Sequence, residues 1–201
     1  MATKNNPDFE TLCAQVRKCY ACSSMNHVHV LGDVNGPLDA DVLFVAEAPG
    51  RLGAARTGIP MTSDVTGRRF HAFLADARVV RERVFITNAI LCNPLSESGN
   101  NRRPRASEVA ACRDFLAAQV ALVHAPVVVA MGSVALESLG RIEPHGAELA
   151  SHVGRAIDWA GRTLVPLYHP SIQSTLSRPH ELQRRDWRRL GKHVRSVLRQ
   201  A

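Results

Sequence analysis

The sequence predicts an α/β fold, a three-layer α/β/α sandwich around a central four-stranded, mainly parallel sheet. Four short apolar or β-branched runs bounded by turn residues indicate strands, and helical patterns lie between them. Strands that alternate with helices form a parallel sheet whose two faces are both covered. A length of 201 residues suits one domain, and we expect it to span residues 1–201.

The first third of the chain predicts a helix, a strand and a second helix. Residues 8–18 carry apolar side chains at helical spacing and end at Cys19. Residues 41–46 form a continuous apolar run that stops before a Pro-Gly turn, which is typical of a buried strand followed by a loop. Residues 67–77 repeat the helical spacing of aromatic and leucine side chains.

The middle of the chain predicts a strand, a polar loop and a long helix. Residues 83–88 are β-branched and aromatic, which favours a second strand. Residues 93–105 are polar and contain two prolines and a glycine, so we expect a loop. Residues 106–123 are rich in alanine and read as an amphipathic helix.

The last third predicts two strands, each followed by a helix. Residues 126–131 are a valine-rich strand, and the Gly-Ser pair that follows can cap a short helix at residues 133–139. Residues 163–168 form the fourth strand, which leads into His169. The final helix, about residues 180–199, places its leucine, tryptophan and valine side chains on one face.

The composition predicts a soluble protein that binds an anionic partner. Hydrophobic residues make up 45% and charged residues 21%, which allows a packed core and argues against disorder. The net charge is +7, and nucleic acid is the commonest partner of such basic chains. Eight Arg and Lys residues against two acids between Arg178 and Arg199 predict contact with DNA phosphates, although a solvated helix face would look similar.

The sequence shows neither a membrane-spanning segment nor a secretory signal, and both observations bear on the cellular compartment. No apolar run approaches the roughly 20 residues that span a bilayer, so we expect no membrane segment. The polar stretch from Met1 to Glu10 lacks the apolar region of a secretory signal, so we expect a reducing, cytoplasmic location. In such a compartment cysteines bind metals more often than they form disulfides.

Four cysteines form a candidate metal site. Cys19 and Cys22 are a C-x-x-C pair, Cys92 follows the second strand, Cys112 lies in the next helix, and Cys13 is left over. A structural zinc site usually shows two close pairs, so this split spacing fits an iron–sulfur cluster at least as well. The alternative is that Cys92 and Cys112 are ordinary buried thiols.

Three polar clusters follow predicted strands, and ligands bind beyond the carboxyl ends of parallel strands. The clusters run from Glu47 to Asp64, from Asn88 to Cys92 and from Tyr168 to Thr175. The first is rich in glycine and small residues, but it lacks the Gly-Lys-Ser/Thr of a Walker A loop and the G-x-G-x-x-G dinucleotide pattern.

Each polar residue of these clusters also has a structural interpretation. Asp64 could simply cap the following helix. Asn88 could anchor a loop through backbone hydrogen bonds. A strand-end His169 beside several hydroxyl and amide side chains favours a binding site over a structural histidine.

Several blocks in the same order resemble the uracil-DNA glycosylase superfamily, nearest to its family 5 with family 4 features. Glu47-Ala48-Pro49-Gly50 resembles the G-E-A-P-G opening of family 4, and the segment 87–92 followed by Arg105, Glu108 and Cys112 resembles the cysteine-bearing segment of families 4 and 5. The stretch from Gly53 to Asp64 and the Tyr168–Thr175 segment resemble family 5 blocks. These blocks and the C-x-x-C pair span Cys19 to Thr175.

The resemblance implies a monofunctional uracil-DNA glycosylase of base-excision repair that carries a [4Fe-4S] cluster. The implied cluster ligands are Cys19, Cys22, Cys92 and Cys112. The implied catalytic residues are Asp64 as the first carboxylate, Glu47 as the second, His169 on the uracil side and Asn88 at the polar edge of the base. The implied substrate-binding residues are Ala48, Pro49, Gly50, Met61, Ser171, Gln173, Ser174 and Thr175. Residues 173–176 would enter the minor groove of the DNA.

Departures from the family pattern concern the choice of base. Glu47 stands where family 5 has an apolar residue, Met61 stands where an aromatic usually stacks on the base, and Ser174 replaces an asparagine. The alternatives are a glycosylase for deaminated purines such as hypoxanthine or xanthine, a non-catalytic iron–sulfur protein that binds DNA, and an unrelated zinc protein. We expect a monomer as the simplest assembly.

Overall fold

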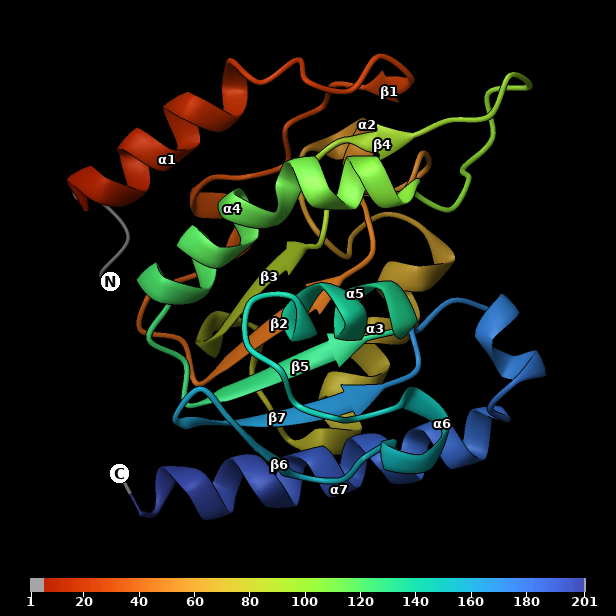
Figure 1. Ribbon diagram of the computed structural model, residues 1–201. Helices are drawn as coiled ribbons and strands as arrows, with labels where there is room; N and C mark the ends of the chain where they lie inside the picture. Colours follow the sequence, from red (N-terminus) through yellow and green to blue (C-terminus); the bar gives the residue numbers. More distant parts are fainter. Residues whose placement is uncertain (1–5, 201) are drawn as a thin grey trace.

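The chain folds around a twisted central sheet with helices on both faces (Figure 1). The computed structural model describes residues 6–200, so part of the polar N-terminal stretch and Ala201 lie outside the described residues. The strand order is β3-β2-β5-β7-β6. The strands are β2 (Val42–Ala46), β3 (Val84–Asn88), β5 (Val127–Met131), β6 (Ile157–Trp159) and β7 (Arg162–Leu167).

The α/β class is confirmed, but the expected number of four strands is wrong. All four predicted strands are present and pair in parallel. The fifth strand, β6, pairs antiparallel with β7 at one edge of the sheet. It has only three residues, so no alternation of buried and exposed side chains could mark it in the sequence.

A second small sheet joins two loops that lie far apart in the sequence. Strand β1 (Met25–Asn26) pairs antiparallel with β4 (Asn93–Pro94). Its strands have two residues each, too short for any strand pattern to be visible in the sequence. This pairing holds the segment after the C-x-x-C pair against the start of the polar loop at residues 93–105.

Helices α3 (Val65–Ala77) and α7 (His180–Leu198) cover one face of the sheet. Trp187 stacks on Phe44 and Phe73, with ring centroids 5.5 and 5.4 Å apart, and so joins α7 to the sheet and to α3. The two helices approach so closely at Gly191 that a Cβ there would lie 1.9 Å from the carbonyl oxygen of Ala77. Any larger residue at position 191 would therefore push α7 away from α3.

Helices α1 (Pro7–Arg17), α4 (Ala106–Leu122) and α5 (Ser133–Gly140) pack on the other face. Asn6 caps α1 by accepting hydrogen bonds from the N–H groups of Asp8 and Phe9. Short helical segments complete the connections: η1 (Asp33–Asn35), α2 (Ala54–Thr57), η2 (Arg81–Arg83), α6 (Leu149–His152) and η3 (Gln173–Leu176). Within residues 6–200, no helix has the length and apolar character needed to cross a membrane.

Candidate active site

A cavity of about 410 Å³ opens at the carboxyl edge of the parallel strands. Its lining comes from the segments that follow β2, β3, β5 and β7, as the strand-end rule predicts. Ten residues expected from the sequence line it: Glu47, Ala48, Pro49, Gly50, Met61, Asp64, Asn88, His169, Ser171 and Gln173. The three polar clusters of the sequence therefore do converge on one site.

Asp64 both caps helix α3 and faces the cavity. Its Oδ1 accepts a hydrogen bond of 2.7 Å from the N–H of Gly67, so the capping interpretation is confirmed. Its Oδ2 lies against Gly53, where an added Cβ would approach to 2.7 Å. One oxygen thus fixes the side chain while the other can act on a ligand.

His169 lines the same cavity as Asp64 and is neutral at ordinary pH. Burial lowers the pKa of His169 from 6.5 to about 4, and the nearby charge of Asp64 acts in the opposite direction. A neutral imidazole carries one N–H donor and no positive charge. The sequence could not decide between the neutral and the protonated form.

The turn after His169 is held by side chains that do not face the cavity. Ser174 donates from its Oγ to the carbonyl oxygens of His169 at 2.6 Å and Ser171 at 2.8 Å. Gln183 of α7 donates in turn to Ser174 at 3.0 Å. Arg69 of α3 donates from its Nε to the carbonyl oxygen of Pro170 at 2.7 Å. These contacts position the imidazole from two helices.

Thr175 and Leu176 extend this turn toward the surface. Thr175 donates its hydroxyl to the carbonyl oxygen of Ile172. The Leu176 side chain is 90% exposed, while Gln173 lies at the cavity rim. The structure therefore places Ser174 and Thr175 in the framework of the turn, and Gln173 and Leu176 at its accessible surface.

Glu47 and Asn88 lie at the carboxyl ends of neighbouring strands. Burial raises the pKa of Glu47, and the positive charge of Arg103 opposes that rise. Asn88 ends β3 with 4% of its surface exposed, and its side-chain amide makes no hydrogen bond to any residue of the described part of the chain. Its amide is therefore available to a ligand in the cavity.

Asn93 and Asn101 of the polar loop also shape the cavity wall, and no sequence pattern singled them out. Asn93 donates to the carbonyl oxygen of Pro49 at 2.7 Å and to Asn101 at 3.0 Å. Asn101 accepts a 3.0 Å hydrogen bond from the N–H of Arg51. Together they clamp the Pro49–Arg51 segment at the cavity wall. The many asparagine and arginine side chains after the second strand were the one sequence feature that could have indicated their role at the site.

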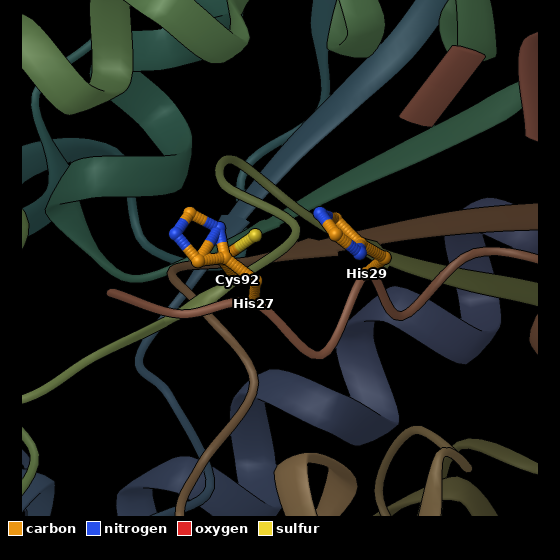
Figure 2. A group of neighbouring side chains, drawn as sticks. All are labelled: His27, His29 and Cys92. Atoms are coloured by element: carbon orange, nitrogen blue, oxygen red, sulfur yellow. The ribbon is translucent and has the colours of Figure 1, made fainter. Parts of the chain in front are cut away.

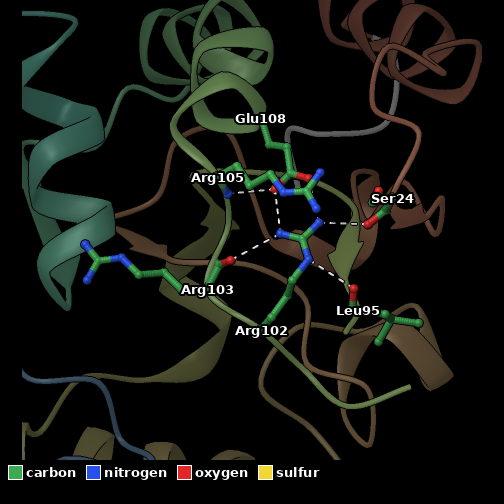
Figure 3. A network of polar contacts seen from close by, with 6 residues as sticks. All are labelled: Ser24, Leu95, Arg102, Arg103, Arg105 and Glu108. Carbon is green, nitrogen blue, oxygen red and sulfur yellow. Dashed lines mark hydrogen bonds and ion pairs between the residues drawn. The ribbon is translucent and has the colours of Figure 1, made fainter. Parts of the chain in front are cut away.

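Arg102 is also a cavity-lining residue that the sequence did not single out. Figure 3 shows the network of polar contacts that surrounds it. Its guanidinium forms a two-pronged ion pair with Glu108 of α4, with distances of 2.8 and 2.6 Å. It also donates to the carbonyl oxygens of Ser24 at 2.9 Å and Leu95 at 3.0 Å. One side chain therefore joins the segment after the C-x-x-C pair, the polar loop and the helix that carries Cys112.

The loop beneath the cavity adopts a strained backbone. Met61 and Ser63 have φ values of 54° and 64°, which side chains other than glycine rarely adopt. Gly67 lies directly beneath them, because a Cβ there would meet the Met61 carbonyl at 2.8 Å. Close packing of the loop on α3 thus places the Met61 side chain in the cavity lining.

Cys19, Cys22, Cys92 and Cys112 are brought together beside the small sheet. Burial raises the pKa of Cys112 to about 11, and the nearby thiols of Cys92, Cys22 and Cys19 raise it further. Backbone N–H groups of His29 and Leu91 donate to the sulfurs of Cys92 and Cys112. Hydrogen bonds of this kind are a regular feature around iron–sulfur clusters. All five cysteines are free thiols, and Cys13 is buried apart from the four.

Four cysteine thiols are the donor set both of a structural zinc ion and of an iron–sulfur cluster. Four sulfurs at about 2.3 Å from one zinc would lie about 3.8 Å from one another. Among residues 6–200, the group with three donor atoms within 4.8 Å of one another is His27, His29 and Cys92, not a set of cysteines. The four thiols, which are near one another, are the donors that an iron–sulfur cluster would use.

The basic helix α7 is partly neutralised. Arg178 pairs with Asp186 at 2.8 Å, and Arg184 pairs with Asp76 at 2.8 Å. The positive side chains of Arg185, Arg189 and Lys192 remain exposed. The exposed face of α7 therefore keeps part of the predicted basic character.

Comparisons with known proteins identify relatives of the chain. The model of the family described as "Uracil DNA glycosylase superfamily" matches residues 34–191. A type-4 uracil-DNA glycosylase of Thermotoga maritima is 33% identical over 177 residues, which cover 87% of each protein. A type-4 enzyme of Archaeoglobus fulgidus is 28% identical over 90% of this chain and 91% of its own length. A type-5 enzyme of Pyrobaculum aerophilum is 30% identical over 68% of this chain and 63% of its own length.

Proposed function

Because the chain belongs to the uracil DNA glycosylase superfamily, we propose that it hydrolyses the N-glycosidic bond of uracil in DNA and leaves an abasic site for base-excision repair. The observation that carries this proposal is the cavity that is lined by both Asp64 and a neutral His169. A carboxylate and an uncharged hydrogen-bond donor suit the two ends of a breaking glycosidic bond.

The uracil nucleotide must leave the duplex to reach the cavity. Unpairing and unstacking one base costs a few kcal/mol, and less for a mismatched base. The exposed Leu176 and the rim residue Gln173 would fill the space that the extruded nucleotide leaves in the DNA duplex. The Pro49–Arg51 segment, clamped by Asn93 and Asn101, supplies a fixed wall for the base.

Cleavage of the glycosidic bond puts positive charge on the sugar and negative charge on the base, and different cavity residues stabilise each. As the bond between C1′ and N1 breaks, its electron pair leaves with uracil, and positive charge develops on the deoxyribose. Asp64 stabilises that positive charge and accepts the proton of the water whose oxygen adds to C1′. His169 donates its N–H to the uracil oxygen that becomes negative, and Asn88 pairs with the polar edge of the base.

Other cavity residues recognise the base or adjust the charge of the site. Met61 packs on the base in place of an aromatic ring. Glu47, whose pKa is raised by burial, serves as the second carboxylate beside Arg103. Ser171 and Gln173 contribute polar contacts at the rim, whereas Ser174 and Thr175 act by holding the turn that carries His169.

We propose that Cys19, Cys22, Cys92 and Cys112 hold a [4Fe-4S] cluster in a reducing, cytoplasmic setting. The cluster would cross-link the loop after α1, the loop after β3 and helix α4, which is a structural contribution. The chain's own residues carry out the proposed chemistry at the cavity. The exposed cations of α7 would bind DNA phosphates, so affinity falls as salt rises, and we propose that a monomer suffices for this contact.

A base-release panel tests the function. The chain is incubated with matched DNA strands that contain uracil, hypoxanthine, xanthine or ethenocytosine, in single- and double-stranded form. Release of uracil above the other bases supports the proposal. Preferential release of hypoxanthine or xanthine would instead indicate a glycosylase for deaminated purines. No release of any base, under conditions in which a control glycosylase is active, would indicate a non-catalytic DNA-binding protein.

A further inference from the structure

Two histidines and one of the four proposed cluster cysteines form a compact group of metal donors (Figure 2). One ligand atom each from His27, His29 and Cys92 lies within 4.8 Å of the others. We propose that this group is a second metal site, which binds a single divalent ion of the zinc class. Two imidazoles and one thiolate are donors that zinc prefers, and a water molecule would complete its tetrahedral shell.

The hydrogen bond of His29 leaves one ring nitrogen free to bind a metal. Its Nε2 lies 2.7 Å from the carbonyl oxygen of Cys19. A carbonyl only accepts, so Nε2 carries the proton and Nδ1 keeps its lone pair. Metal-binding histidines regularly donate their other ring N–H to a carbonyl, which fixes the tautomer and the ring orientation.

His27 presents a polar atom that the described protein does not satisfy. Its Nδ1 is buried and has no hydrogen-bond partner among residues 6–200. The ring packs against Tyr20 and His29, with centroids 4.9 and 5.7 Å away. Buried polar atoms normally find a partner, so this nitrogen, beside two other metal donors, is open to a metal ion.

The backbone around the group is held in a strained form. His29 has a φ of 47°, in the left-handed region, and its N–H donates to the sulfur of Cys92. The β1–β4 pairing of Asn26 with Asn93 holds the two segments in register on either side. Strain of this kind persists where the surroundings enforce it and is common at ligand sites.

The second site and the cluster share Cys92, so the two cannot be filled together. An ion at His27, His29 and Cys92 takes the thiolate that the proposed cluster requires. Zinc should therefore enter chains that lack the cluster. This consequence holds whether or not the chain releases uracil.

Metal analysis of the full-length chain tests the site. The Cys112→Ser chain loses one proposed cluster ligand but keeps all three donors of the second site. Expressed with zinc in the medium, it should contain less iron and a single zinc ion per chain, measured by elemental analysis. X-ray absorption should show one sulfur and two imidazole nitrogens around the zinc. Adding His27→Asn and His29→Asn should lower its zinc content at least about tenfold.

Controls separate the site from adventitious binding and from misfolding. His124→Asn, at an exposed histidine outside the group, should leave the zinc content of the Cys112→Ser chain unchanged. If the Cys112→Ser chain does not fold by circular dichroism, the wild-type chain is grown with scarce iron and ample zinc. There, zinc should rise as iron falls. Absence of zinc from folded protein, a sulfur-only shell, or zinc that survives both histidine substitutions would overturn the proposal.

Discussion

Replacing Arg102 with methionine should destabilise the chain strongly, because it leaves a buried carboxylate without its cation. The side chains of Arg102 and Glu108 are 18% and 6% exposed, and two hydrogen bonds of 2.8 and 2.6 Å join them. In the Arg102→Met chain, Glu108 keeps only the 2.7 Å hydrogen bond from the N–H of Arg105. Breaking a buried ion pair from one side typically costs about 3–5 kcal/mol.

The cost should depend on pH in a defined direction. The hydrogen bond from Arg102 holds the pKa of Glu108 below its usual value, against the effect of burial. A lowered pKa in the folded state gives stability that is present above the unfolded pKa, about 4.3, and is lost as pH falls through the folded pKa. The destabilisation by Arg102→Met should therefore be largest near neutral pH and should shrink as pH falls below about 4.

Denaturant unfolding of wild-type and variant chains with the same measured iron content gives the free-energy difference. The matched control is Arg103→Met, one residue away, because Arg103 and its partner Glu137 are 64% and 60% exposed and 3.6 Å apart. That control should change stability by less than about 0.5 kcal/mol. An Arg102→Met chain no less stable than Arg103→Met, or a difference that does not vary with pH, would refute the reasoning.

Three further predictions concern the cavity. Asp64→Asn should lower the single-turnover rate of uracil release about 10²–10⁴-fold while DNA binding changes little, and equal or greater damage by Glu47→Gln would reverse their assigned roles. The rate of uracil release should not change with pH around 6.5, the ordinary histidine pKa, because His169 has a pKa of about 4 and stays neutral above it. A pH–rate profile that bends near 6.5, and that loses this bend in His169→Asn, would contradict this. Gly53→Ala should slow uracil release, because the added Cβ would lie 2.7 Å from Oδ2 of Asp64 and displace the carboxylate. Gly32→Ala is the control and should keep the wild-type rate, because a Cβ there meets nothing within 4 Å.

The sequence predicted the layers of the fold because continuous apolar runs mark buried parallel strands. Strands β2, β3, β5 and β7 all carry that pattern. Strand β6 and the β1–β4 pair are too short for any periodicity, and their pairing depends on tertiary contacts. The β6 edge of the sheet and the small β1–β4 sheet were therefore beyond what local patterns could show.

The sequence also predicted most of the cavity, because parallel strands place the residues that follow them at one edge. Glu47, Asn88 and His169 meet for that reason. The direction in which a side chain points within a turn could not be predicted from the sequence. Ser174 bonds to the carbonyl oxygens of its own turn, and Asn93 bonds to a segment more than forty residues away in the sequence. Such contacts follow from the folded backbone and not from residue type.

A structure of the Asp64→Asn chain bound to a duplex that contains one uracil would test the central claim most directly. We expect an extruded uracil in the cavity, with an oxygen of the base next to the imidazole of His169. The sugar carbon C1′ should lie next to the side chain at position 64. A uracil that stays stacked in the duplex, or that binds with its sugar toward His169, would contradict the account.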